Sequence, residues 1–238
     1  MLLLVAALLV AVSLATHYVA YRLQVAAPQS ARTAAWTTIM RLFDVNTEQN
    51  IPTWFSSSLL LGCALLVATI AAVARRSGRR DGGHWIGLAV VVALMSLDEA
   101  VALHERLEAP TRTLLGSGVT GVVHFTWVLP AALLAVVVAS AFVGFLARLP
   151  ARIRRLVVAA GVTYVTGAIG LETVGGVLLD AQAHRALYLV VAATEEGLEM
   201  TAGVLLLYAG MCCLRLLPEA DGGYRLTLHE SIQVAARR

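Results

Sequence analysis

The chain of 238 residues is 59% hydrophobic, only 14% of its residues are charged, and its mean hydropathy is +0.78. This composition excludes a soluble globular domain and is typical of a polytopic membrane protein. The formal net charge of +3 requires no nucleic-acid partner, because basic loops beside anionic lipid account for it.

Six apolar stretches are long enough to cross a hydrocarbon layer of about 30 Å, at about 2–24, 53–74, 85–106, 122–146, 156–178 and 186–214. The first lacks the basic start and the cleavage site of a secretory signal, so we interpret it as a retained helix. The sequence therefore predicts an all-α, polytopic membrane protein, with one six-transmembrane-helix bundle over 1–216. A short cytoplasmic tail, 217–238, follows, and its TLHESIQVAARR segment is expected to form a short helix.

The connection between the first two spans, roughly 28–52, has a polar half and an amphipathic half. SARTAAWTTIMRLF is expected to form an interfacial helix with its apolar side chains towards lipid. The alternating polar residues of DVNTEQN lack the glycine and the closing glutamate of a calcium loop, which favours a polar turn. We expect Asn50 to cap the second span, with Pro52 in its first turn.

Arginines follow the second and the fourth spans, within 75–80 and 148–155. Both clusters lie in short loops on one side of the predicted bundle, and the positive-inside rule makes that side cytoplasmic. Both termini are then predicted to be cytoplasmic.

Six acidic side chains fall inside the predicted spans, with no lysine or arginine at matching depth: Asp98, Glu99, Glu172, Glu195, Glu196 and Glu199. Each intramembrane acid costs roughly 2.5–3.5 kcal/mol on the insertion scale. Protonation, histidine partners or a bound cation would reduce this cost. His17, His104 and His124 lie in the outer half of the predicted bundle, at the same end as the acids.

Helical spacing places several of these acids on shared helix faces. Glu195, Glu196 and Glu199 fit within an arc of about 100° on one helix. Four glycines surround Glu172 and allow close approach of a neighbouring backbone, and Asp98 aligns with Glu105 at i, i+7. The sequence predicts a carboxylate-rich pocket between the third, fifth and sixth spans.

Carboxylates with imidazole are ligands for iron, manganese or zinc. The candidate metal ligands are Glu172, Glu195, Glu196, Glu199, His104 and His124. Asp98 and Glu99 are the candidate catalytic carboxylates, since a spare carboxylate can act as a general base beside a metal-activated water or dioxygen. We expect a metal-dependent membrane enzyme, with redox chemistry favoured over hydrolysis.

Several alternatives use the same residues. Chains of Asp, Glu and His also form proton or cation pathways, although the inner half of this bundle offers few polar groups. Haem ligation by His104 with His124 or His17 is a further alternative. In another alternative, the acids are protonated and form hydrogen bonds between helices, and the protein is an accessory subunit. A membrane hydrolase with the Ser, Asp and three-His zinc core of the alkaline ceramidase-like superfamily is disfavoured, because the paired H-x-x-x-H of that superfamily is missing.

The segments FDVNTEQNIPTWFSSSLLL, SLDEAVALHERL and TEEGLEMTAGVLLLYA together resemble a family of bacterial multi-pass membrane proteins without an established function. The resemblance implies a location in the bacterial cytoplasmic (inner) membrane and transfers no catalytic role. The expected partners are membrane lipid and a lipid-phase or periplasmic substrate. Assembly as a homo-oligomer or within a larger membrane complex is also open.

Overall fold

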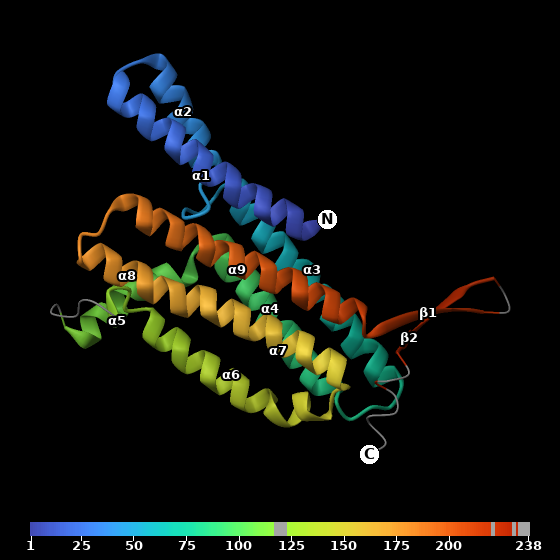
Figure 1. The fold of residues 1–238 in the computed structure, drawn as a ribbon. Coiled ribbons are helices and arrows are strands. Elements are labelled where there is room, and N and C mark those ends of the chain that lie inside the picture. Colours follow the sequence, from blue (N-terminus) through green and yellow to red (C-terminus); the bar gives the residue numbers. More distant parts are fainter. Residues whose placement is uncertain (117–122, 220–221, 230–231, 233–238) are drawn as a thin grey trace.

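The computed structural model describes residues 1–116, 123–219, 222–229 and 232, and helices dominate this part of the chain (Figure 1). Among the described residues, five helical stretches are long and apolar enough to cross a membrane: Leu2–Ala26 (α1), Ile51–Arg76 (α3), Gly82–Val101 (α4), Val128–Arg148 (α6) and Ala151–Asp180, which contains α7 and α8. The all-α class is confirmed, and the apolar lengths indicate a membrane protein.

The sixth predicted span corresponds to α9 (Arg185–Met211), which is not among these five. Its three glutamates make it more polar than the others, so the count of six spans and the side of each terminus stay predictions. The predicted start of the fourth span, at 122, lies outside the described residues. The helix itself begins at Val128.

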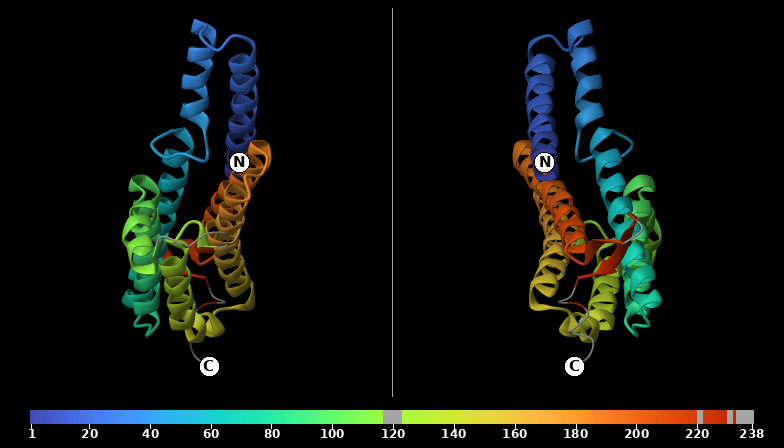
Figure 2. Two further views of the ribbon diagram at one scale, coloured as in Figure 1. Left: turned by 90° about the vertical axis from the view of Figure 1, so that its left-hand side faces the viewer. Right: turned by 90° about the vertical axis from the view of Figure 1, so that its right-hand side faces the viewer.

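α1 and α2 (Ala31–Phe43) form a helical hairpin at one end of the molecule. The Ser30 hydroxyl caps α2 by accepting a hydrogen bond from the Thr33 N–H at 3.1 Å. Gly197 of α9 faces Val10 of α1, so α1 is shifted along α9 towards the end at Arg185. Figures 1 and 2 show the hairpin projecting beyond the other helices.

The start of α3 confirms the predicted cap. The Asn50 side chain accepts a hydrogen bond from the Thr53 N–H at 3.1 Å, and Pro52 lies in the first turn. The Asn50 amide also donates to the Asp44 carbonyl oxygen at 2.6 Å. One side chain thus joins the helix start to the turn that precedes it.

The predicted third span, 85–106, is not one continuous helix. α4 ends at Val101, Ala102 adopts a left-handed conformation with φ of 51°, and α5 (Leu103–Leu115) begins immediately afterwards. A left-handed residue commonly ends a helix, because the helical ladder cannot continue through it. Asp98 and Glu99 therefore lie in the last turn of α4, and not within a longer helix that continues to residue 106.

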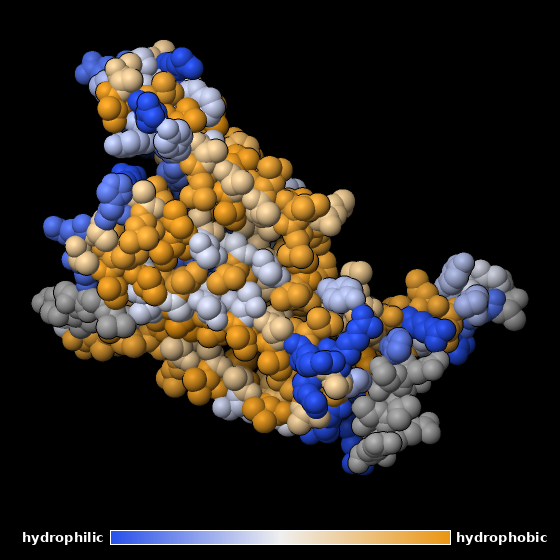
Figure 3. Space-filling view, viewed as in Figure 1, coloured by the Kyte–Doolittle hydropathy of each residue, from blue (hydrophilic) through white to orange (hydrophobic). Residues whose placement is uncertain are grey.

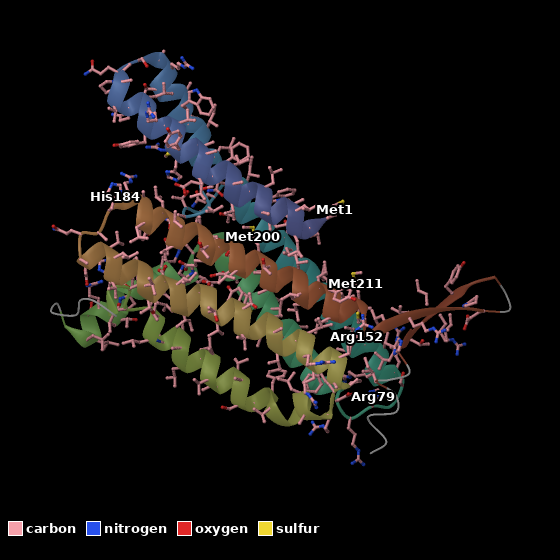
Figure 4. All side chains as sticks on the ribbon, in the orientation of Figure 1. Met1, Arg79, Arg152, His184, Met200 and Met211 are labelled. Carbon is pink, nitrogen blue, oxygen red and sulfur yellow. The ribbon has the colours of Figure 1, made fainter. Side chains whose placement is uncertain are left out.

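The end of the bundle opposite α5 is closed by apolar packing. Trp85 of α4, Ile70 of α3 and Phe145 of α6 are fully buried there. Figure 4 marks this end by Arg79 and Arg152, and the opposite end by His184. Apolar side chains cover the visible flank between the two ends, and polar side chains gather at the ends (Figure 3).

A π-helix, Thr166–Leu171, joins α7 (Ala151–Val165) to α8 (Glu172–Asp180). α7, the π-helix and α8 pack against α9 along their length (Figure 1). A Cβ atom on Gly167 would lie 3.0 Å from the Glu195 carbonyl oxygen, so the glycine permits close contact between the π-helix and α9.

The segment after α9 is a β-hairpin. β1 (Leu214–Pro218) pairs antiparallel with β2 (Tyr224–Leu228), and Leu214 faces Leu228. The prediction of a helix from Thr227 onwards is wrong at its start, because Thr227 and Leu228 belong to β2. Leu228 is only 2% exposed, so burial against the apolar end of the bundle favours the strand. Residues 230–231 and 233–238 lie outside the described part.

Candidate functional site

The turn of residues 44–50 is attached to several helices. The Val45 N–H donates to Ser13 Oγ of α1 at 3.2 Å, and Tyr188 of α9 donates to Asn46 Oδ1 at 3.3 Å. His17 Nε2 lies 2.9 Å from Asp44 Oδ1, a charge contact whose angles do not make a hydrogen bond. These attachments give Glu48, in the same turn, a defined position.

Asp98 and His104 form a close pair across the break between α4 and α5. The His104 N–H donates to Asp98 Oδ1 at 2.7 Å, and His104 Nδ1 lies 3.0 Å from Asp98 Oδ2. The imidazole also packs against Trp127, with ring centroids 4.5 Å apart. Because Nδ1 is engaged, Nε2 is the ring nitrogen that remains for a ligand.

Glu48, His104 and Glu105 offer ligand atoms that all lie within 4.8 Å of one another. We call these three residues the outer cluster. Glu48 Oε2 is buried and has no hydrogen-bond partner, whereas buried polar atoms in folded proteins normally have one. A cation would provide the missing interaction.

The charges of the outer cluster affect one another. Burial raises the pKa of Glu48 to about 7; the carboxylates of Glu105 and Asp98 also raise it, and His104 lowers it. Burial lowers the pKa of His104, but the hydrogen bond and charge of Asp98 outweigh this and raise it to about 9. These interactions favour the imidazolium form of His104 at neutral pH.

Glu108 of α5 holds the segment that leads into α6. Its carboxylate accepts hydrogen bonds from the Thr126 N–H at 2.7 Å and the Trp127 N–H at 3.2 Å. Arg112 Nε also donates to it, at 2.9 Å. Trp127 packs against His104, so Glu108 helps to hold in place a residue that contacts the outer cluster.

The acids of α9 lie deeper and face other elements. Glu195 interacts with Glu172, and Glu199 interacts with Tyr164 of α7. Glu196 interacts electrostatically with both Glu199 and Glu99. The structure thus brings together the predicted pocket residues of α4, α8 and α9.

A cavity of about 10 Å³ lies beside Glu199, among α3, α4, α7 and α9. Ser56, Glu99 and Tyr164 contribute its other polar walls. Its size is near the lower limit for one water molecule. Ser56 is a buried packing residue that also lines this cavity.

His124 lies in the loop before α6, where its Nδ1 pairs with Asp180 at the end of α8. It is not part of the outer cluster. His17, His104 and His124 thus each contact a different aspartate.

Of the outer cluster, sequence reasoning predicted His104 as a metal ligand but named neither Glu48 nor Glu105 as one. Glu48 was visible only in a polar turn of alternating residues, and its distance of 56 residues from His104 along the chain hid their contact. On one continuous helix, Glu105 would lie on the same face as Asp98. The left-handed Ala102 interrupts the helix, and the Glu105 carboxylate instead lies within 4.8 Å of the ligand atoms of Glu48 and His104.

A family model described as "Domain of unknown function (DUF8692)" matches residues 1–214, which is most of the chain. No curated protein and no solved structure matches. The expected resemblance to a family without an established function is confirmed.

Proposed function

The chain belongs to the DUF8692 family, and we propose that it is a multi-pass membrane protein that binds a divalent metal ion through the outer cluster. The observation that carries this proposal is the convergence of ligand atoms from Glu48, His104 and Glu105 within 4.8 Å. Iron, manganese and zinc all accept this mixture of carboxylate and imidazole ligands.

The surroundings of His104 support a metal site. Histidines that bind metals commonly donate their other ring N–H to a carboxylate, which fixes the ring and raises its basicity. Asp98 is in position to accept from His104 Nδ1, which leaves Nε2 for the ion. Asp98, predicted as catalytic, would then be a positioning residue.

The buried, unpartnered Oε2 of Glu48 is a second support. Leaving such an atom without a partner costs about 1–3 kcal/mol. An ion would bind this oxygen and offset the charges of two carboxylates together.

The chemistry we propose is metal-dependent catalysis at the outer face of the bacterial cytoplasmic membrane, on a lipid-phase or periplasmic substrate. Oxygen-rich ligands suit iron or manganese, which favours redox chemistry over hydrolysis. The charges of Glu99 and Glu48 interact, and Glu99 is the carboxylate that we assign as the general base for a bound substrate. The acids of α8 and α9 would form the deeper wall of the site.

Proton or cation translocation is the second candidate. The Glu172–Glu195 and Glu199–Tyr164 interactions favour it, since they continue the polar side chains from the outer cluster into the bundle. The opposite end of the bundle is closed by apolar packing around Trp85 and Phe145, which leaves the path incomplete within one chain.

Metal analysis tests the proposal. The protein is purified in detergent without chelators, loaded separately with Mn²⁺, Fe²⁺ and Zn²⁺, passed through a desalting column and analysed by elemental mass spectrometry. We expect about one ion per chain in the wild type and in Glu196→Gln/Glu199→Gln. Glu48→Gln and His104→Gln should lose the ion while eluting as folded protein.

Two results would contradict this assignment. If the wild type retains none of the three ions, the metal proposal is wrong, and proton or cation translocation is the remaining candidate. Loss of metal only in Glu196→Gln/Glu199→Gln would move the site to the acids of α9.

A further inference from the structure

An apolar groove runs between α3 and α4, away from the outer cluster. Its volume is about 420 Å³, and small side chains form its floor: Ala64, Ala68 and Ala71 from α3 and Ala89 and Ala93 from α4. Leu61 lies at one end and Arg75 at the other. Both helices are among the five long and apolar enough to cross a membrane, so the groove faces the lipid or a partner within it.

Arg75 is the only charged residue that lines the groove, within the part of the chain that the structure describes. Its side-chain stem packs closely over Gly82, where a Cβ atom would lie 2.5 Å from Arg75 Cγ. In the same described part, the Arg75 guanidinium has neither an ion pair nor a side-chain hydrogen bond. The nearby Arg79, by contrast, is bound by Asp81. An unpaired guanidinium at the end of an apolar groove favours an anionic ligand.

The groove is long enough to hold a lipid chain of one leaflet. Fourteen residues separate Leu61 from Arg75, which corresponds to about 21 Å of helix at 1.5 Å per residue. Half of the hydrocarbon layer is about 15 Å thick. A chain that lies along the alanines would therefore place its headgroup at Arg75.

We propose that this groove binds one acyl chain of an anionic phospholipid, and that Arg75 binds the phosphate of its headgroup. The proposal rests on α3 and α4 spanning the membrane and is independent of the metal site. A second copy of this chain is a poorer occupant. The acids near this end in the described part, Asp81 and Glu219, are already paired with Arg79 and Arg225, so neither is free for Arg75.

Native mass spectrometry of the detergent-solubilised full chain tests this proposal, with dioleoyl phosphatidylglycerol and dioleoyl phosphatidylcholine as probes. The wild type should bind one phosphatidylglycerol more tightly than phosphatidylcholine. Arg75→Gln should weaken phosphatidylglycerol binding about fivefold, since each arginine near the lipid surface contributes about that factor. Arg76→Gln is the matched control, because Arg76 is an equally exposed neighbour that does not line the groove.

Ala68→Phe separates the groove from the headgroup contact. Ala68 is exposed, so phenylalanine would fill the groove without entering the packed core, and it should reduce binding of both lipids. Equal binding of the two lipids by the wild type would overturn the proposal, as would equal effects of Arg75→Gln and Arg76→Gln. A dimer that Ala68→Phe dissociates, with no lipid retained, would also overturn it and assign the groove to a second copy.

Discussion

The Asp98–His104 pair is the residue-scale feature on which the outer cluster depends. Asp98 contacts both the backbone N–H and the ring Nδ1 of His104, so one carboxylate sets the position and the orientation of the imidazole. Trp127 restrains the ring from one face. The remaining ring nitrogen is thereby available to an ion together with Glu48 and Glu105.

Asp98→Asn should weaken metal binding about 10–100-fold without abolishing it, because the amide keeps the shape but loses the charge that orients and polarises His104. The measurement is a Mn²⁺ or Zn²⁺ titration in detergent, followed by calorimetry. Asp180→Asn makes the same change beside His124, outside the outer cluster, and should leave the affinity unchanged. Equal affinities for wild type and Asp98→Asn would refute this orienting role.

Glu108 contributes stability that depends on pH. Burial raises the pKa of its carboxyl, but hydrogen bonds from Arg112, Thr126 and Trp127 outweigh this and hold the pKa below its usual value. A carboxylate of lowered pKa stabilises the folded state above its unfolded pKa of 4.5 and loses that contribution as pH falls through its folded pKa.

Glu108→Gln should therefore destabilise the protein at pH 7 by about 1–2 kcal/mol, since it weakens charge-assisted hydrogen bonds at the start of α6. Thermal unfolding in detergent from pH 7 down to pH 3 is the measurement. The gap between variant and wild type should shrink below pH 4.5. Glu219→Gln, in an exposed pair with Arg225, is the control and should change stability by less than about 0.5 kcal/mol. A pH-independent gap would show that the charge of Glu108 is not the cause.

At the scale of elements, the π-helix between α7 and α8 sets how closely this pair approaches α9. Gly167 lies in its first turn and faces the Glu195 carbonyl oxygen and the Glu199 side chain. π-helices are rare and often occur at functional sites. Here the π-helix lies between Tyr164 and Glu172, the two partners of the α9 acids.

Gly167→Ala should destabilise the bundle by about 1–3 kcal/mol, because the added methyl group would meet a backbone atom that has little room to move. Gly161→Ala is the matched control in α7. Nothing lies within 4 Å of the Cβ that it would add, so it should be neutral or gain up to about 1 kcal/mol of helix propensity. Chemical unfolding in mixed micelles compares the two. Equal stabilities would mean that α7 and α9 separate more easily than their contact suggests.

Element boundaries show where sequence reasoning succeeds and where it stops. The Asn50 cap and Pro52 follow from local backbone chemistry, and both were predicted. The break at Ala102 was not, because alanine favours a helix and no glycine or proline marks the position. The tail hairpin depends on burial of Leu228 against α3, a long-range contact that residues 227–238 alone do not encode.

At the scale of the whole molecule, the sequence predicted the helical class and the gathering of acids at one end. Asp98, Glu99, Glu172 and the α9 glutamates do interact with one another. The outer cluster itself required tertiary structure, since Glu48 reaches His104 only because its turn is attached to α1 and α9. Hydropathy predicts spans, but it does not predict which loop folds over them.

The projection of α1 beyond the other helices has a consequence for the surroundings of the outer cluster. Tyr18 and Tyr21 of α1 are 60% and 65% exposed, and aromatic residues of this kind settle at the level of lipid headgroups. His17, their neighbour, contacts the turn that carries Glu48. In the proposed membrane arrangement, the outer cluster would lie level with the headgroups or below them. If the cluster binds an ion as proposed, that ion would leave lipid phosphate oxygens as well as water, so its apparent affinity would depend on the lipid composition of the membrane.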